Sequence, residues 1–399
     1  FDVVITAGET LLLSTDSDII AGGPGNSTAT TQPVINGRVD LRNLTIEQGG
    51  KLVFLGPNTA TILATGDVRI NGLISVNGGD NFGVSTLATA NQPEEGASGQ
   101  AGGGGGGKAS ALTSQSTPRG GAGEGAFGVP GIGGGGGETT YAPAGPCETE
   151  YRRGAGGGGG QLGSSVRYDV DGSFLTPLAI CQMLVGMDVE PGFPGSQNGV
   201  GAVSQVAPAV GGEVGLSPFS DASPLNNFYG TMITASGNQV LGELSSVWAG
   251  SGGGGGGDAV TSSTFPLTPF LVSGDEKGSG GGGGAGGLLI LAIGDIVLEP
   301  SGSVTADGGH GGGGENRWLY DRVGGASGGG SGGHIVMSSA GSIVIQAEAT
   351  AAATGDFYRD NASTPIHDAR PLSALGGQGG AGRQDRCGAG RNGPSSWRL

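Results

Sequence analysis

The stretch TILATGDVRINGLISVNGG, residues 61–79, decides the fold because it recurs along the chain. It returns as LILAIGDIVLEPSGSVTADGG at residues 289–309, and a third copy begins with HIVMSSAGSIVIQ at residue 334. Each copy places an apolar strand before a Gly turn, then a second short strand, and the first two copies continue through a third strand to Gly-Gly. Short self-similar strands indicate that one rung buries its face against the next. We therefore predict a parallel β-solenoid, a right-handed β-helix by the usual rule for parallel connections, with little or no α-helix.

Polyglycine is the second recurring pattern of the sequence, in which 93 of 399 residues are Gly. Eight runs stand out: 102–107, 133–137, 156–160, 252–257, 280–284, 311–314, 328–333 and 376–380, the last two interrupted by Ser331 and Gln378. A polyglycine II helix has three residues per turn and no internal hydrogen bonds, so its amides must bond to neighbours. We predict that the runs pack side by side as a bundle, with bulkier excursions at its ends.

The strand repeats and the glycine runs divide the chain into four parts. We expect solenoid rungs over 1–95, the first polyglycine II segments with loops over 96–160, an irregular β excursion over 161–250, and polyglycine II segments interleaved with rungs over 251–399. Two further alternating stretches, 3–14 and 39–56, fit strands of the first part.

The stretch GQAGGGGGGKAS, residues 99–110, resembles a phosphate-binding loop. Gly102, Gly107 and Lys108 have the right spacing, but Ala109 stands where the magnesium-binding hydroxyl belongs. The stretch also follows a polar turn rather than a strand and opens no helical pattern. In a chain this rich in glycine such a motif arises by chance, so we predict no nucleotide or other cofactor.

Charge and hydropathy exclude several classes of protein. The net charge is −16 with only three Lys, which argues against binding nucleic acid or an anionic membrane. No run of about 18 apolar residues is present, so we expect no membrane insertion. Because strand-like sequence starts at once from Phe1, we expect a secreted chain, extracellular or at the cell surface, with its signal peptide removed. The three His, at 310, 334 and 367, are scattered and no C-x-x-C is present, which makes a zinc site improbable.

Cysteines and sequons fit an exterior setting. We predict a disulfide between Cys147 and Cys181, which leaves Cys387 as a free thiol or an intermolecular bond. The glycosylation sequons at Asn26 and Asn361 lie in expected loops, whereas the one at Asn43 lies in an expected strand.

The repeat G-G-A-G-G-x-[LI]-x-[LI] at residues 283–291, the similar Gly-Gly-His-Ile-Val-Met at 332–337 and the eight glycine runs resemble a known class of protein. They are similar to secreted glycine-rich β-helix surface proteins of bacteria and, more loosely, to phage tail-tip adhesins built on polyglycine II helices. The resemblance covers about half the chain. It implies a surface fibre or adhesin and brings no catalytic residue with it.

The leading functional hypothesis is an extracellular structural protein, one subunit of a self-assembling fibre, sheath or surface layer. Solenoid ends must be capped or paired, and neither end shows an amphipathic capping helix. We expect residues 3–14 to form one strand that pairs with its own next rung and with another copy, head to tail. Val4, Leu11 and Leu13 would fix the register in pockets of the acceptor.

Two other hypotheses remain open. In an adhesin that binds surface glycans or receptors, Trp318 and Tyr320 would form a recognition loop, but the sequence favours a structural role in which they cover a small hydrophobic pocket at the bundle end. A polysaccharide-active enzyme needs paired carboxylates, and Asp67 and Asp295 occupy equivalent repeat positions. Acids at Gly-Asp turns are usually turn formers, so we predict no enzymatic activity.

Overall fold

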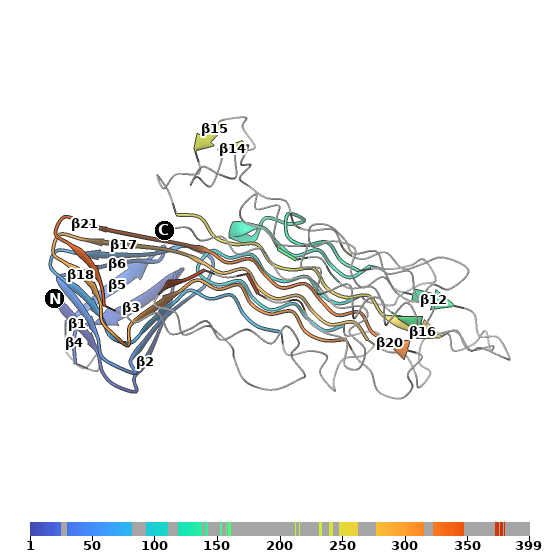
Figure 1. The fold of residues 1–399 in the computed structure, drawn as a ribbon, viewed down its shortest axis with the longest axis horizontal. Helices are drawn as coiled ribbons and strands as arrows, with labels where there is room; N and C mark the ends of the chain where they lie inside the picture. Colours follow the sequence, from blue (N-terminus) through green and yellow to red (C-terminus); the bar gives the residue numbers. More distant parts are fainter. Residues whose placement is uncertain are drawn as a thin grey trace.

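Strands gather at one end of the molecule, and extended glycine-rich segments run from them toward the other end (Figure 1). The computed structural model describes residues 1–24, 30–81, 93–110, 119–137, 247–261, 277–314 and 322–346, with the short pieces 140–142, 152–153, 157, 159–160, 212, 215, 231–233, 239–241, 372–374, 376–377 and 379. In these residues the helical content is one short 3₁₀ turn at Ala126–Gly128. The predicted all-β class is therefore confirmed.

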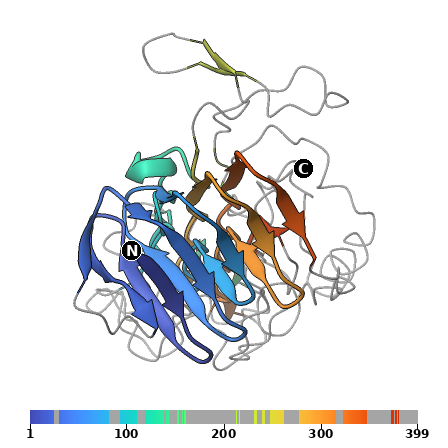
Figure 2. The same cartoon turned by 90° about the vertical axis from the view of Figure 1, so that its left-hand side faces the viewer.

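The strands of the solenoid form three sheets that are stacked rung by rung (Figure 2). Sheet A is formed, in order, by β22 (Ile343–Ile345), β18 (Ile296–Leu298), β10 (Val68–Ile70), β7 (Asn43–Ile46), β1 (Asp2–Ile5) and β4 (Gly23–Pro24). Sheet B is formed by β2 (Thr10–Ser14), β8 (Lys51–Leu55), β11 (Leu73–Ser75), β19 (Ser303–Thr305) and β23 (Leu372–Ser373). Sheet C is formed by β21 (His334–Ser339), β17 (Gly287–Ala292), β9 (Ala60–Ala64), β6 (Arg38–Leu41), β5 (Thr31–Ile35) and β3 (Ser17–Ala21).

Each complete rung crosses sheet C, then sheet A, then sheet B, which is the arrangement of a β-solenoid. The two copies of the repeat lie on adjacent rungs in parallel register, since Ile62 pairs with Ile290 and Val68 with Ile296. Ile343 of the third copy pairs with Ile296 on the next rung. The solenoid predicted from the repeat is therefore confirmed, although more than 200 residues separate the first two copies in sequence.

Alternation of side chains builds the core between the three sheets. In β10, for example, Val68 and Ile70 are buried and Arg69 is exposed. The largest fully buried side chains are Phe54, Ile5, Leu13, Ile20, Leu44, Ile46, Ile62, Ile70, Ile74 and Leu288. Burying each such side chain contributes roughly 1.5–3 kcal/mol, so the stack of rungs rather than any single rung supplies the stability.

The first predicted strand, residues 3–14, is wrong in one respect: it is two strands. A turn at 6–9 divides it, in which the Glu9 amide donates to the Thr6 carbonyl at 3.0 Å and Gly8 has a φ of +80°. β1 then lies in sheet A and β2 in sheet B. Both belong to the first rung of their own chain, pairing with β7 and β8.

A hairpin covers the core at this first rung. β5 runs antiparallel to both β3 and β6, unlike the parallel rungs that follow. Its Val34 and Ile20 of β3 are 0% and 1% exposed and belong to the main hydrophobic core. This end of the solenoid therefore has a cap. The sequence shows no capping helix here, and the cap is a β-hairpin instead.

The glycine runs form the predicted polyglycine II bundle, as their hydrogen-bond period shows. Along the run 250–257 the carbonyls of Gly250, Gly253 and Gly256 accept from residues 104, 107 and 110 of a neighbouring run. The intervening carbonyls and the amides bond in the same steps of three to other runs, so that backbone hydrogen bonds join this run to five neighbours: 104–110, 121–124, 134–137, 279–285 and 325–331. A period of three is the period of the polyglycine II helix.

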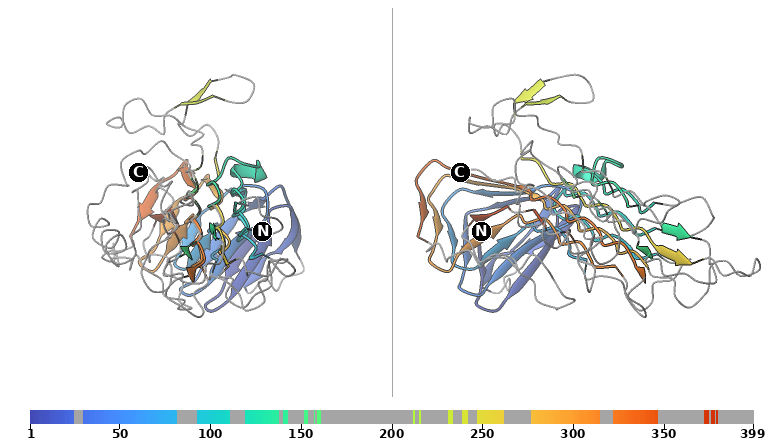
Figure 3. Two further views of the ribbon diagram at one scale, coloured as in Figure 1. Left: turned by 90° about the vertical axis from the view of Figure 1, so that its right-hand side faces the viewer. Right: turned by 45° about the vertical axis from the view of Figure 1, so that its right-hand side comes forward.

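The bundle is continuous with the solenoid, as the side-by-side chains in Figure 3 show. The run 278–286 leads directly into β17, and 324–333 leads into β21. After β11 and β19 the chain returns into the bundle through residues 76–79 and 306–314. The rung β17–β19 is thus the closed end of a long loop whose two arms are glycine-rich segments of the bundle.

Short strands mark excursions from the bundle. At the end away from the solenoid, β12 (Thr140–Ala142) pairs with β16 (Ala259–Thr261), and β13 (Arg152–Arg153) pairs with β20 (Arg322–Val323) (Figure 1). This is where we expected the bulkier excursions. Within 161–250, most of which lies outside the described residues, β14 (Thr231–Ile233) and β15 (Gln239–Leu241) form an antiparallel pair.

Candidate functional site

The run that resembles a phosphate-binding loop has its amides occupied by other glycine runs. The Gly107 amide donates to the Gly253 carbonyl at 2.8 Å and the Ser110 amide to the Gly256 carbonyl at 3.0 Å. Lys108 is exposed, and its Nζ lies 2.7 Å from Oε1 of Glu95. A phosphate cradle needs free N–H groups that converge on one point. Here they diverge to different neighbours, which gives the run a structural role.

The Gly-Asp turns between sheets C and A form a column of side chains that ties successive rungs together. The column contains Asp2, Asn43, Asp67, Asp295 and Ser342. Oδ1 of Asn43 accepts the amide of Asp67 at 2.9 Å, and Oδ1 of Asp67 accepts the amide of Asp295 at 3.0 Å. Oδ1 of Asp295 in turn accepts the amide of Ser342 at 2.8 Å. Both acids considered as a catalytic pair therefore hold the backbone of the next rung.

The same column explains the glycines that precede Asp67, Asp295 and Ser342. A Cβ at Gly66 would collide with the side-chain oxygen of Asn43, one at Gly294 with Asp67 and one at Gly341 with Asp295. Each glycine leaves room for the oxygen that reaches up from the rung before. The Gly-Asp dipeptide of the repeat is thus a packing unit of two adjacent rungs.

Substitution at this column provides a test of that role. We expect Gly66→Ala to lower the free energy of unfolding by about 2 kcal/mol, because the displaced Asn43 amide loses its bond to the Asp67 amide. In an Asn43→Ala background the same change should have less than half this effect. Chemical denaturation of the four proteins of this double-mutant cycle measures the coupling. Additive effects would show that Gly66 is needed for its backbone alone.

Other polar side chains repeat the pattern at the remaining turns. Oδ1 of Asn77 accepts the Asp307 amide at 2.8 Å, and Oδ1 of Asp80 accepts the His310 amide at 2.8 Å. At the first rung, hydrogen bonds from Arg42 hold the pKa of Asp2 well below its usual range. Each of these carboxylates has a structural bond, and none of these bonds assembles a pair across an open site.

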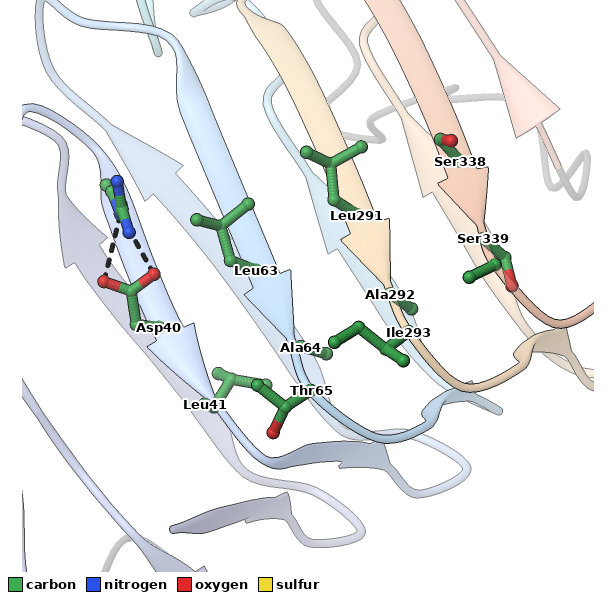
Figure 4. Close-up of a pocket in the computed structure, with 12 residues that line it drawn as sticks. Asp40, Leu41, Leu63, Ala64, Thr65, Leu291, Ala292, Ile293, Ser338 and Ser339 are labelled. Atoms are coloured by element: carbon green, nitrogen blue, oxygen red, sulfur yellow. Dashed lines mark hydrogen bonds and ion pairs between the residues drawn. The ribbon is translucent and has the colours of Figure 1, made fainter.

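A groove of about 540 Å³ crosses the outer face of sheet C (Figure 4). Parallel register sets Asp40, Leu63, Leu291 and Ser338 in one row across it, and Arg38 lies beside Asp40 at one end. Arg38 and Asp40 bond to each other, with Nε 2.9 and 3.0 Å from the two carboxylate oxygens. The groove thus offers an apolar floor between a neutralised ion pair and serine hydroxyls, which suits contact with a protein surface better than chemistry.

The proposed assembly residues lie within the first rung. Leu13 is 1% exposed and Leu11 is partly buried, both packed into the chain's own core. Val4 is half-buried on the other face of β1, between Pro24 and Thr45 in register. Leu13 therefore fills the core of its own chain rather than an acceptor pocket. The other predicted site residues lie outside the described residues: Cys147, Cys181, Cys387, Trp318, Tyr320, Asn26 and Asn361.

Two buried groups were not anticipated from the sequence. In the bundle, Nζ of Lys277 lies 3.5 Å from Oδ2 of Asp258, with side chains 7% and 0% exposed. His334 opens β21, where its Nδ1 accepts the Trp248 amide at 3.3 Å. Burial lowers the pKa of His334 to about 4. The sequence contained one indication of this burial: each of these residues directly adjoins a glycine run, where a side chain is surrounded by the packed backbone of the bundle.

Comparison with protein-family models, curated protein sequences and solved structures finds no match for this chain. The residues that the structure describes include no helix of the length and hydropathy needed to cross a bilayer. The same residues bring together no group of three or more His, Cys, Asp or Glu side chains suited to a metal ion.

Proposed function

We propose that the chain is a structural protein of the cell exterior, one subunit that assembles with further copies into a fibre, sheath or surface layer. The observation that carries the proposal is that the polar groups of the chain make hydrogen bonds that hold its own rungs and glycine runs together. Turn carboxylates such as Asp67 and Asp295 bond to the next rung, and the glycine amides bond to neighbouring runs. This chemistry builds a long, ordered body whose sheets end in strand edges.

Open edges and composition support assembly with other copies. A solenoid exposes a sheet edge at each end, and such edges pair with further chains unless they are blocked. In the described residues β21 is a terminal strand of sheet C and β22 is a terminal strand of sheet A. The resemblance to secreted glycine-rich surface proteins and the net charge of −16 fit an exterior location.

The groove on sheet C favours a second candidate, a receptor-binding adhesin. Ile293 at its rim is 64% exposed, and Leu63 and Leu291 form its floor. An apolar surface on a rigid scaffold suits recognition of a protein partner. An enzyme acting on polysaccharides is less well supported, because Asp67 and Asp295 already bond to backbone amides.

Electron microscopy of purified chain tests the proposal. In negative stain across a concentration series we expect filaments or sheets whose length or area grows with protein concentration. The matched sample is the Leu63→Asp/Leu291→Asp variant, which changes the groove and leaves the sheet edges intact. Growth that survives in this variant supports assembly through the edges. Uniform single particles at every concentration would contradict the proposal and favour the adhesin.

A further inference from the structure

The two ends of the solenoid differ in how their strand edges are protected. At the N-terminal end the Asp18 carboxylate accepts the Ser14 amide of β2 and the Ile19 amide of β3, each at 2.8 Å. β4 ends in Pro24, which has no N–H to offer. An acid and a proline at an edge are devices that stop strands from pairing further.

The C-terminal rung has main-chain groups that point away from the molecule. In the ladder with β18, the Ile296 amide donates to the Ser342 carbonyl at 2.9 Å and the Gln346 amide to the Leu298 carbonyl at 2.7 Å. Alternate residues of a parallel strand bond to the same side, so the N–H and C=O groups of Ile343 and Ile345 face outward. Within the described part of the chain no hydrogen bond reaches them.

The same alternation applies to β21. Its even-numbered residues bond to β17, as the Ala340 amide does to the Ala292 carbonyl at 3.0 Å. The main-chain groups of Ile335 and Met337 therefore face the outer edge. Two neighbouring sheets thus end, at this rung, in edges with unused donors and acceptors among the residues described.

Apolar side chains accompany these edges. Ile343, Val344 and Ile345 are 45%, 37% and 45% exposed, whereas Ile296 and Leu298 on the rung below are each 1% exposed. The segments 334–339 and 343–345 contain no Asp, Glu, Lys or Arg, in a chain of net charge −16. Two copies can therefore meet at this end without the repulsion that acidic surfaces would impose.

We propose that this C-terminal rung, β21 with β22, is the docking surface for the same rung of a second copy, related by a two-fold axis. Such an axis makes the two edges antiparallel, so that the outward N–H and C=O groups of each copy can pair with those of the other. The opposite end of another copy fits less well, since β22 would meet β4 with Pro24 and β21 would meet β3, whose Ile19 amide is held by Asp18. The inference rests on the proposed function for its purpose, as one of the joints of an extended assembly.

Paired surface variants test the joint. Ile343→Lys/Ile345→Lys places charges against each other across the axis at side chains that are already about half exposed. Leu12→Lys/Ile19→Lys is the matched control at the N-terminal end, where these side chains are 56% and 65% exposed. In sedimentation equilibrium, at concentrations below those at which extended assemblies form, we expect a wild-type monomer–dimer equilibrium whose Kd rises by roughly 100-fold in the first variant and stays within about 3-fold in the control.

Hydrogen exchange of the wild-type protein gives a second readout that needs no variant to fold. Exchange of the Ile343 and Ile345 amides should slow as protein concentration rises. A wild-type monomer at every concentration, protection of these amides that does not depend on concentration, or a dimer broken only by the N-terminal control would each overturn the inference. The proposed function fails separately: a dimer without any extended assembly in the microscope contradicts it and leaves the C-terminal joint standing.

Discussion

Gly255→Ala should lower the free energy of unfolding by more than about 4 kcal/mol, a loss reached by few single substitutions. The added Cβ would overlap the carbonyl of Lys108 on the neighbouring run. The backbone cannot move away, because the Gly255 amide donates to Gly121 at 3.0 Å and its carbonyl accepts from Gly137 at 2.9 Å. The clash therefore breaks hydrogen bonds to several runs at once.

Gly105→Ala is the matched control for this loss. A Cβ there has as its nearest contact Oε2 of the flexible Glu124 side chain, at 3.0 Å. We expect less than about 1 kcal/mol of change, or slight stabilisation from the reduced entropy of the unfolded chain. Urea denaturation of both variants provides the comparison. Equal and small losses would show that the runs do not pack as described.

Acidification should destabilise the protein through His334. Its pKa is about 4 in the folded protein, because burial disfavours the charged imidazolium, against 6.5 as the ordinary value. A lowered folded pKa means that the unfolded chain binds more protons between these values, so this contribution is complete above pH 6.5 and declines as the pH falls. The shift corresponds to about 3 kcal/mol at pH 4.

His334→Gln separates this contribution from that of the carboxylates. The variant lacks the titration, so its free energy of unfolding should fall less than that of wild type between pH 6.5 and 4. The Asp and Glu residues contribute equally to both curves and cancel in the difference. Parallel pH profiles would mean that His334 is solvated, or able to accept a proton, in the folded protein.

Much of the fold could be predicted because its determinants are local. The alternation in residues 61–79 and its repetition at 289–309 depend on neighbouring residues and on rungs that carry the same pattern. The glycine runs likewise predict their own packing, because segments without side chains can lie backbone to backbone. The break inside 3–14 was missed although Gly8, with a φ of +80°, was a local turn signal.

The site-level features could not be predicted because they join residues far apart in sequence. The bond from the Asp295 amide to Asp67 spans 228 positions, and nothing in either turn identifies the other as its neighbour. The bonds from Asp18 to two edge strands depend on a hairpin whose direction the alternation does not specify. The assembly role of Leu13 was assigned from its apolar character alone, which cannot distinguish a core from an interface.

Hydrogen bonds along the run 250–257 repeat every three residues, so the effect of an insertion in such a run depends on whether its length is a multiple of three. Inserting one residue rotates everything downstream by a third of a turn, so amides would face the wrong neighbours and a solvent-facing residue such as Lys108 would turn into the bundle. Inserting three residues restores every direction and only slides the run by one turn. The spacing of the rare side chains within the runs therefore matters in multiples of three residues, because it decides whether each side chain points to solvent or into the bundle.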